Sequence, residues 1–397
     1  MILPLFFCLL FFPSLLMVSL GQSSLASGLL LSILIVYFLG FFYISSNISS
    51  RKKINFKKII FFVCFFIFLL LHFSLNNIRD VPLDIDRFIW SYVALMFFAI
   101  GCFIFHSVIS ELQDDKLSKI IRAILFFMLM NAICGVLGIK MFPHMSHKPV
   151  GVFSEPSHFA LALAPFIIYS CVIKDRWYKF FLFVFFVFAV LVQNLTTMIV
   201  IILSLSLITR VRLKTFVPIF IAICIAVLFF AKSQYFTDRF SISAESDNIS
   251  VVVLLRGWEM ALLAFRESGL WGGGFQQFGM LGLGGELSDK LAALKLSDQN
   301  LYDGGSSAAK IIGELGVWGF AGLFFYLLLC MRCIVFLRHG DNPKKAIDIF
   351  FAACVLALLI ELFVRGVGYF STGFFLATTA VIGLDFRNAI KCQKNEA

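Results

Sequence analysis

Apolar segments close to 20 residues long recur from one end of this 397-residue chain to the other. A helix of about 20 apolar residues crosses the roughly 30 Å hydrocarbon core of a bilayer, and it satisfies its own backbone hydrogen bonds there. Hydrophobic residues make up 60% of the chain and charged residues 14%, against roughly 45–50% and 25% in soluble domains. The sequence therefore predicts an all-α integral membrane protein and excludes a soluble enzyme.

We expect about 12 transmembrane helices in four regions. Helices 1–9 occupy residues 1–231, a long loop 232–307, helices 10–12 residues 308–386, and a tail 387–397. The first apolar run resembles a signal peptide but lacks a basic start, so we expect it to be retained. The predicted spans are 3–20, 25–45, 58–75, 88–109, 120–142, 157–173, 178–193, 195–209, 213–231, 308–331, 347–364 and 367–385.

Lysines and arginines are concentrated in the linkers that follow even-numbered spans. Membrane topology accounts for the net charge of +10, because basic loops stay in the cytoplasm, and no nucleic-acid partner is predicted. Both termini are therefore expected to be cytoplasmic, and the loop 232–307 faces outward. The cysteines lie mostly inside apolar runs without the spacing of a zinc site, so neither a metal nor another cofactor is predicted.

The long outer loop contains an amphipathic stretch at 252–267. At 100° per residue, Arg256 and Arg266 share a polar face, while Trp258 and Phe265 share the opposite one. We expect a surface helix that turns its arginines toward whatever occupies an outer cavity. A solvated charged face is the alternative, and it is the stronger interpretation for Arg266.

Three glycines follow this stretch at 272–274. They permit a turn that ends the helix, or a close approach of the backbone N–H groups of Gly273 and Gly274 to a ligand. They do not form a phosphate loop, because no Gly-Lys-Ser/Thr motif follows them.

Ionisable residues stand near the outer ends of the last predicted spans. Lys310 and Glu314 are four residues apart, as are Glu361 and Arg365. This spacing predicts ion pairs within a helix, whereas ionisable groups beside hydrocarbon also mark ligand sites. Arg365 keeps its charge at all ordinary pH values and suits a phosphate or pyrophosphate.

The segment GVFSEPSHFAL, residues 151–161, opens the sixth predicted span with Glu155 and His158. Pro156 suits the first turn of a helix, and an acid beside it is favoured by the helix dipole. Partial burial would favour the neutral form of Glu155 and raise its pKa, which suits a general base. Helix initiation and catalysis are compatible roles for this carboxylate.

A second acidic motif lies in the outer loop NNIRDVPLDIDRF. Asp84 and Asp86 form a D-x-D arrangement, and hard oxygen ligands of this kind hold divalent ions. Acids at these positions are also favoured at the N-terminus of the following span. We regard the second role as the stronger interpretation.

Four strings together resemble the Wzy-type O-antigen polymerases of Gram-negative bacteria, within the wider group of O-antigen polymerases and ligases. They are GVFSEPSHFAL at 151–161, RGWEMALLAF through GGGFQQFG at 256–279, GSSAAKIIGELGVWGFAGL at 305–323 and RGVGYFSTG at 365–373. Their order and the 12-span topology with a late outer loop agree with that family. The specific strings cover about a fifth of the chain.

This resemblance implies a glycosyltransferase that joins oligosaccharide repeat units carried on undecaprenyl pyrophosphate. It implies the periplasmic face of the inner membrane as the place of reaction, membrane lipid as surroundings and a chain-length regulator protein as a further partner. A general base must act on the sugar hydroxyl, with Glu155 or His158 as candidates. Fixed cations would stabilise the leaving pyrophosphate without a metal. The predicted substrate-binding residues are Arg256, Arg365, Arg266, Gly273, Gly274, Glu314, Glu361 and Tyr369.

Two alternatives compete with a polymerase. The related ligases, which move finished glycan onto lipid A–core, typically carry a histidine where this chain has Gly305 upstream of the string ELG. That departure favours a polymerase. A non-enzymatic transporter or flippase would also use intramembrane charges, but the loop after the second span, SSNISSRKKINFKK, lacks the Gly–Asp–Arg-type signature of major-facilitator carriers.

Overall fold

The structure, a computed structural model, describes residues 2–22, 24–46, 56–79, 81–142, 148–208, 248–338 and 344–384. Across these ranges the regular secondary structure is helical. Within the described residues, eight helices are long and apolar enough to cross a membrane: α1 (Ile2–Ser19), α2 (Ala26–Ser46), α3 (Phe56–Ile78), α4 (Ile85–Ile109), α5 (Asp114–Val136), α6 (Pro156–Ile173), α13 (Ser307–Arg338) and α14 (Ala346–Phe363). The predicted class, an all-α multi-pass membrane protein, is thereby confirmed.

Three shorter apolar helices coincide with further predicted spans. They are α7 (Tyr178–Leu191), α8 (Leu195–Ile208) and α15 (Thr372–Gly383). The predicted span at 213–231 lies outside the described residues. The number and orientation of the spans therefore stay predictions.

Helix starts follow the capping chemistry of the sequence. Asp84 caps α4 because its side chain accepts from the backbone N–H of Arg87, and Ser371 caps α15 by accepting from that of Phe374. Both residues are of the type that is preferred at this position. Pro156 occupies the first turn of α6, where its missing N–H leaves no hydrogen bond unmade. The last predicted span therefore begins at Thr372 and not at residue 367.

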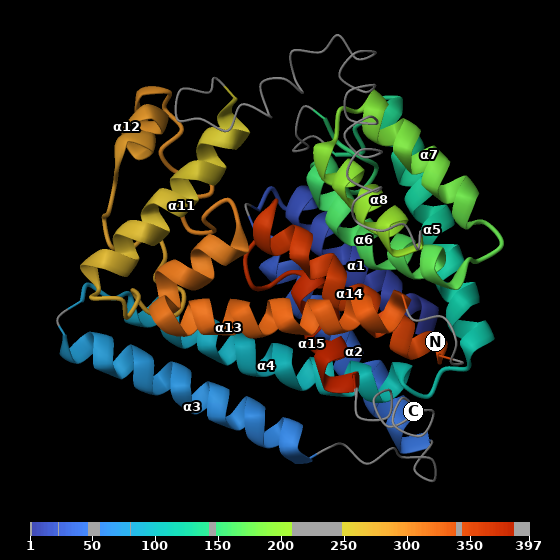
Figure 1. The fold of residues 1–397 in the computed structure, drawn as a ribbon, viewed down its shortest axis with the longest axis horizontal. Helices are drawn as coiled ribbons and strands as arrows, with labels where there is room; N and C mark the ends of the chain where they lie inside the picture. Colours follow the sequence, from blue (N-terminus) through green and yellow to red (C-terminus); the bar gives the residue numbers. More distant parts are fainter. Residues whose placement is uncertain are drawn as a thin grey trace.

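Helix α14 lies at the centre of the bundle, with 83% of its residues buried, whereas only 17% of an 18-residue apolar stretch of α3 is buried and α3 runs along the edge (Figure 1). α14 packs against α6, α13 and α15. Aromatic rings fill the core, where Phe6 meets Phe105, Phe166 and Phe350 edge to face. This arrangement holds the two ends of α14 against the ends of its neighbours.

One end of the bundle collects the starts of α5 and α14 and the ends of α6, α8 and α13. Arg122 pairs with Asp175 at 2.5 Å, and Arg338 donates to the backbone oxygen of Ser206 at 2.7 Å. The same helix ends surround a cavity of 590 Å³. All of these ends belong to the side that the basic linkers predict to be cytoplasmic, so the grouping is consistent with the predicted alternation of spans.

Helices α11 (Ile249–Glu267) and α12 (Glu286–Ala293) lie beside the start of α13, at the far end of the molecule from the N-terminus (Figure 1). The predicted loop helix at 252–267 is thus present and begins three residues earlier. Helix α13 is broken at Gly316, whose φ is 56° and ψ −130°. The short first half of α13 packs against α11.

Candidate functional site

The glycine segment 272–274 closes the break in α13. The N–H of Gly273 donates to the carbonyl of Gly313 at 2.9 Å, and that of Gly274 to Glu314 at 2.8 Å. In return, Val317 donates to the carbonyl of Leu270 at 2.9 Å. The helix carbonyls freed by the break are thus satisfied internally. The expected approach of these two N–H groups to a ligand is not observed, because α13 occupies both.

Only glycine allows this contact. A Cβ atom at Gly316 would overlap the backbone of Leu270 and Trp271, and one at Gly272 would overlap the backbone of Glu314 and Gly316. Irregular backbone at membrane depth is tolerated where protein buries it. The glycines therefore serve a close approach of two chain segments.

Two polar residues of α3 complete the junction, and sequence reasoning missed them. The imidazole Nε2 of His72 lies 3.0 Å from the carbonyl oxygen of Trp271, and the amide of Asn76 donates to that of Gly272 at 3.1 Å. Both side chains are buried inside an apolar helix. A histidine or an asparagine inside an otherwise apolar span is a sequence signal that could have identified them.

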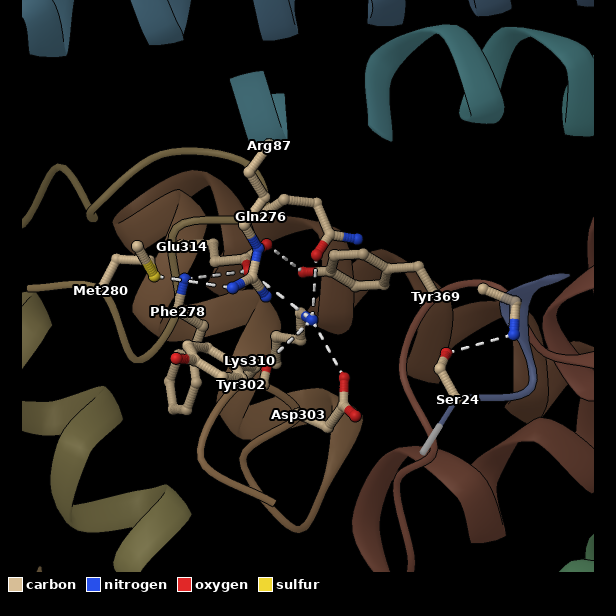
Figure 2. Close-up of polar contacts among 11 residues, drawn as sticks. Ser24, Arg87, Gln276, Phe278, Met280, Tyr302, Asp303, Lys310, Glu314 and Tyr369 are labelled. Atoms are coloured by element: carbon tan, nitrogen blue, oxygen red, sulfur yellow. Dashed lines mark hydrogen bonds and ion pairs between the residues drawn. The ribbon is translucent and has the colours of Figure 1, made fainter. Parts of the chain in front are cut away.

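A second polar cluster surrounds Lys310, which is 2% exposed. Its ammonium donates to Gln276 at 3.2 Å, to the carbonyl of Tyr302 at 2.8 Å and to Asp303 at 3.2 Å (Figure 2). Glu314 lies 4.0 Å away, so the predicted pair at i,i+4 spacing is confirmed. All three N–H donors of this ammonium therefore have acceptors within the protein.

Glu314 and Tyr369 belong to the same cluster. Glu314 is fully buried and accepts hydrogen bonds from the Tyr369 hydroxyl at 2.8 Å and from the N–H of Phe278 at 3.2 Å (Figure 2). Lys310 also lies 5.1 Å from the centre of the Tyr369 ring. The structure therefore assigns these two predicted substrate-binding residues to an internal network that fastens the loop after α14 to α13.

Arg256 differs from its expected placement. It is 2% exposed, and its guanidinium donates to the backbone oxygens of Ser297, at 2.7 Å, and Gln299. Arg256 lies on the buried face of α11 and holds the loop after α12, instead of facing an outer cavity. Arg266 is exposed near the end of the same helix, as the solvated-face interpretation expects.

Asp84 also makes a structural contact that the sequence did not predict. Its backbone N–H donates to the amide oxygen of Gln277 at 2.7 Å, and the amide nitrogen of Gln277 donates back to its carbonyl at 3.0 Å. Together with its capping contact, this accounts for Asp84 as a structural residue. Within the described residues, no three His, Cys, Asp or Glu side chains gather with metal-site geometry.

The remaining predicted residues meet at the N-terminal end of α6. Arg365 donates to Glu155 at 3.0 Å, although 210 residues separate them. Ser157 donates to the same carboxylate at 3.0 Å, and His158 Nδ1 lies 3.1 Å from the Ser154 hydroxyl. The side chains of Arg365 and Glu155 are 21% and 38% exposed, so this ion pair is partly open to solvent, unlike the enclosed pair of Lys310 and Glu314.

The pKa of Glu155 moves opposite to the expectation. Burial raises it, but the neighbouring His158 and Arg365 and the hydrogen bonds from Ser157 and Arg365 outweigh burial and hold the pKa of the carboxyl below its usual value of 4.5. Glu155 is therefore an ionised carboxylate that already has a cationic partner.

Glu361 does not pair with Arg365, because α14 ends between them and Arg365 turns to Glu155. Glu361 is 1% exposed, and its Oε1 has no hydrogen-bond partner. Together with His158 it lines a cavity of 30 Å³. The structure thus places Glu155, His158, Arg365 and Glu361 around one end of α6 and α14.

Comparisons with models of known protein families, with curated proteins and with solved structures find no match to this chain.

Proposed function

We propose that the protein is a membrane glycosyltransferase that joins oligosaccharide repeat units carried on a polyprenyl pyrophosphate. This is the activity of the O-antigen polymerases that its sequence resembles. The proposal includes the periplasmic face of a Gram-negative inner membrane as the place of reaction. The single observation that carries it is the partly exposed Arg365–Glu155 ion pair with His158 beside it.

This group of side chains offers what the reaction requires. Arg365 is a permanent cation with a planar set of donors, which suits a pyrophosphate. When a pyrophosphate draws Arg365 away, the carboxylate of Glu155 loses a partner and its proton affinity rises. Glu155 or His158 can then accept the proton of the attacking sugar hydroxyl. Substrate binding would thereby activate the base.

Bond changes in the proposed reaction balance without a cofactor. The acceptor oxygen loses its proton and forms a bond to the anomeric carbon, while the bond from that carbon to the pyrophosphate oxygen breaks. The proton passes through the base to the pyrophosphate. Arg365 stabilises the charge that develops on the leaving group.

Deletion of the gene in its host, followed by a lipopolysaccharide gel, tests the function. A core bearing one repeat unit supports a polymerase. Bare core would instead indicate a ligase or a flippase, and lipid-linked polymer accumulating outside would separate these two.

Complementation with variants tests the site. We expect Arg365→Lys and Glu155→Gln each to reduce polymer at least tenfold, as loss of a charge-stabilising or general-base group typically does. The matched control is Arg176→Lys, an exposed arginine at the opposite end of the bundle, at equal protein level in the membrane. Full polymer amount and length in both site variants would refute the assignment.

A further inference from the structure

Glu361 is an unusual carboxyl because it is buried and incompletely hydrogen-bonded. It lies in the last turn of α14 at 1% exposure. Ser371, the cap of α15, hydrogen-bonds to it, and α15 can approach Oε2 closely because Gly373 has no side chain. Oε1 has no partner among the described residues. A buried polar atom of this kind is normally satisfied by an ordered water.

Space for water exists beside this carboxyl. Two cavities, of 10 and 30 Å³, are both lined by Glu361. A water molecule needs about 10–15 Å³ and two to four polar partners, so the larger cavity, of 30 Å³, has room for about two. Its polar lining comes from Glu361, His158, Ser14, Ser371 and Thr372.

His158 connects this cavity to the outer ion pair. It lines the same cavity as Glu361, and its charge interacts with Glu155 and Arg365. Its Nδ1 is engaged by Ser154, which leaves the other ring nitrogen for a second partner. The imidazole therefore stands between the exposed ion pair and the buried carboxyl.

We propose that Glu361 is a positioning residue that stores a proton for this site and exchanges it with His158 through water in the 30 Å³ cavity. This inference rests on the proposed glycosyl transfer. The proton that Glu361 holds passes through water and His158 to the pyrophosphate oxygen as the bond from that oxygen to the anomeric carbon breaks. The proton of the attacking hydroxyl, released as the new C–O bond forms, returns through His158 and water to Glu361.

Few other titratable groups face Glu361. Tyr326 of α13 lies near enough to interact with it, but its hydroxyl donates to the carbonyl of Val355. Cys354, on the same helix, lines the smaller cavity. From α15 and α1 the lining is uncharged, and His158 is the ionisable residue that α6 contributes. His158 is thus the proton partner that the geometry provides.

Infrared difference spectroscopy on the full chain in lipid nanodiscs tests the link without any substrate. In the difference between spectra recorded at acid and at alkaline pH, protonated Glu361 gives a carbonyl band, and this band shifts in heavy water. We expect Glu361→Gln to remove this band. We expect His158→Gln to keep it and to move its titration midpoint by about one pH unit, as loss of a neighbouring charge does.

The matched control is Glu314→Gln, which removes the other fully buried glutamate, one whose carboxylate is hydrogen-bonded by Tyr369 and Phe278. It must leave the Glu361 band unchanged. Survival of the band in Glu361→Gln, or an unmoved midpoint in His158→Gln, would overturn the inference.

An activity measurement separates this inference from the proposed function. We expect Glu361→Gln to lower kcat about tenfold with KM unchanged and to alter the pH profile, and Glu361→Asp to restore part of the rate. A wild-type rate and pH profile in Glu361→Gln would refute the proton store while polymerisation stands. If the Glu361 band shifts its midpoint in His158→Gln but the protein joins no repeat units, the proposed function is refuted and the proton link between Glu361 and His158 stands.

Discussion

At the scale of single residues, the ionisable groups fall into two kinds. Arg256, Lys310 and Glu314 are enclosed, and the protein itself supplies their partners. Glu155 and Arg365 are partly exposed, and their main partners are each other. A ligand can displace the second kind of contact at little loss, because both groups are already partly hydrated. The first kind has no such freedom, since an unpaired buried charge is strongly unfavourable.

The Glu155–Arg365 pair has a definite pH dependence. The folded-state pKa of Glu155 lies below its usual value of 4.5, so the stability from this group is fully present above that value and is lost as pH falls through the lowered pKa. We expect Glu155→Gln to lower the melting temperature at pH 7 but to have a shrinking effect below about pH 4.5. Melting of both proteins in nanodiscs across this range measures it.

Because Glu155 is 38% exposed, solvent screening keeps this stability difference small. Ser157→Ala is a comparison variant, since it removes one hydrogen bond from an uncharged donor to the same carboxylate and leaves the ion pair, so we expect it to weaken the pH dependence and not to abolish it. A constant difference between wild type and Glu155→Gln down to pH 3 would contradict the lowered pKa.

At the scale of elements, the break in α13 is built by glycines on two segments. The apolar run at 308–331 predicts only a continuous span. The structure shows that Gly316 takes a left-handed φ of 56° and that the 270–274 segment inserts against it. Neither segment has this conformation for local reasons alone, because each supplies the hydrogen-bond partners that the other lacks.

Substitution of Gly316 by alanine tests this junction. A side chain at this φ of 56° and ψ of −130°, a sparsely populated backbone region, is unfavourable by about 1–3 kcal/mol, and overlap with the backbone of Leu270 adds to this. We expect a clearly lower melting temperature and faster proteolysis of the 270–300 loop. The matched control is Gly322→Ala on the same helix, where a Cβ meets open space.

Alanine at Gly322 is expected to be neutral or slightly stabilising, because alanine favours helix over glycine by about 1 kcal/mol. Equal melting temperatures for the two variants would show that the junction at Gly316 does not constrain the fold.

At the scale of the whole molecule, the helix ends sort into two groups. The ends at Asp114, Lys174 and Arg338 gather around one cavity, and Glu155 and Arg365 gather at the opposite ends of their helices. The basic linkers predict that the first group is cytoplasmic. Placement of the proposed site on the outer face depends on this assignment.

Cysteine labelling tests the assignment. Asp289 on α12 and Arg176 between α6 and α7 are both exposed. With the tail residue Cys392 replaced by serine, we expect Asp289→Cys to react with a membrane-impermeant maleimide in permeabilised-outer-membrane cells. Arg176→Cys should react only after the inner membrane is opened. The reverse pattern would place the proposed site in the cytoplasm and remove the basis for a periplasmic reaction.

Much of the architecture was predictable from local patterns. The apolar segments predicted α1–α8 and α13–α15 to within a few residues, with three larger differences. Helix α5 starts and ends six residues earlier than its predicted span, α13 ends seven residues later, and α15 starts five residues later. The loop helix was also predicted, but its buried face was not. The packed side of this helix is not purely apolar, because it carries Arg256. The guanidinium of Arg256 donates to backbone carbonyls of a loop about 40 residues further along the chain.

The sequence by itself determined the class of this protein and the approximate position of its helices, because crossing a bilayer depends on length and apolarity, which are local properties. It also supplied Glu155, His158 and Arg365 as chemical candidates. Only the tertiary structure decided that Arg365 meets Glu155 and not Glu361, and that Arg256 and Glu314 are enclosed. Helices that are apolar on all sides carry no periodicity that indicates a neighbour, so partners depend on packing between distant segments.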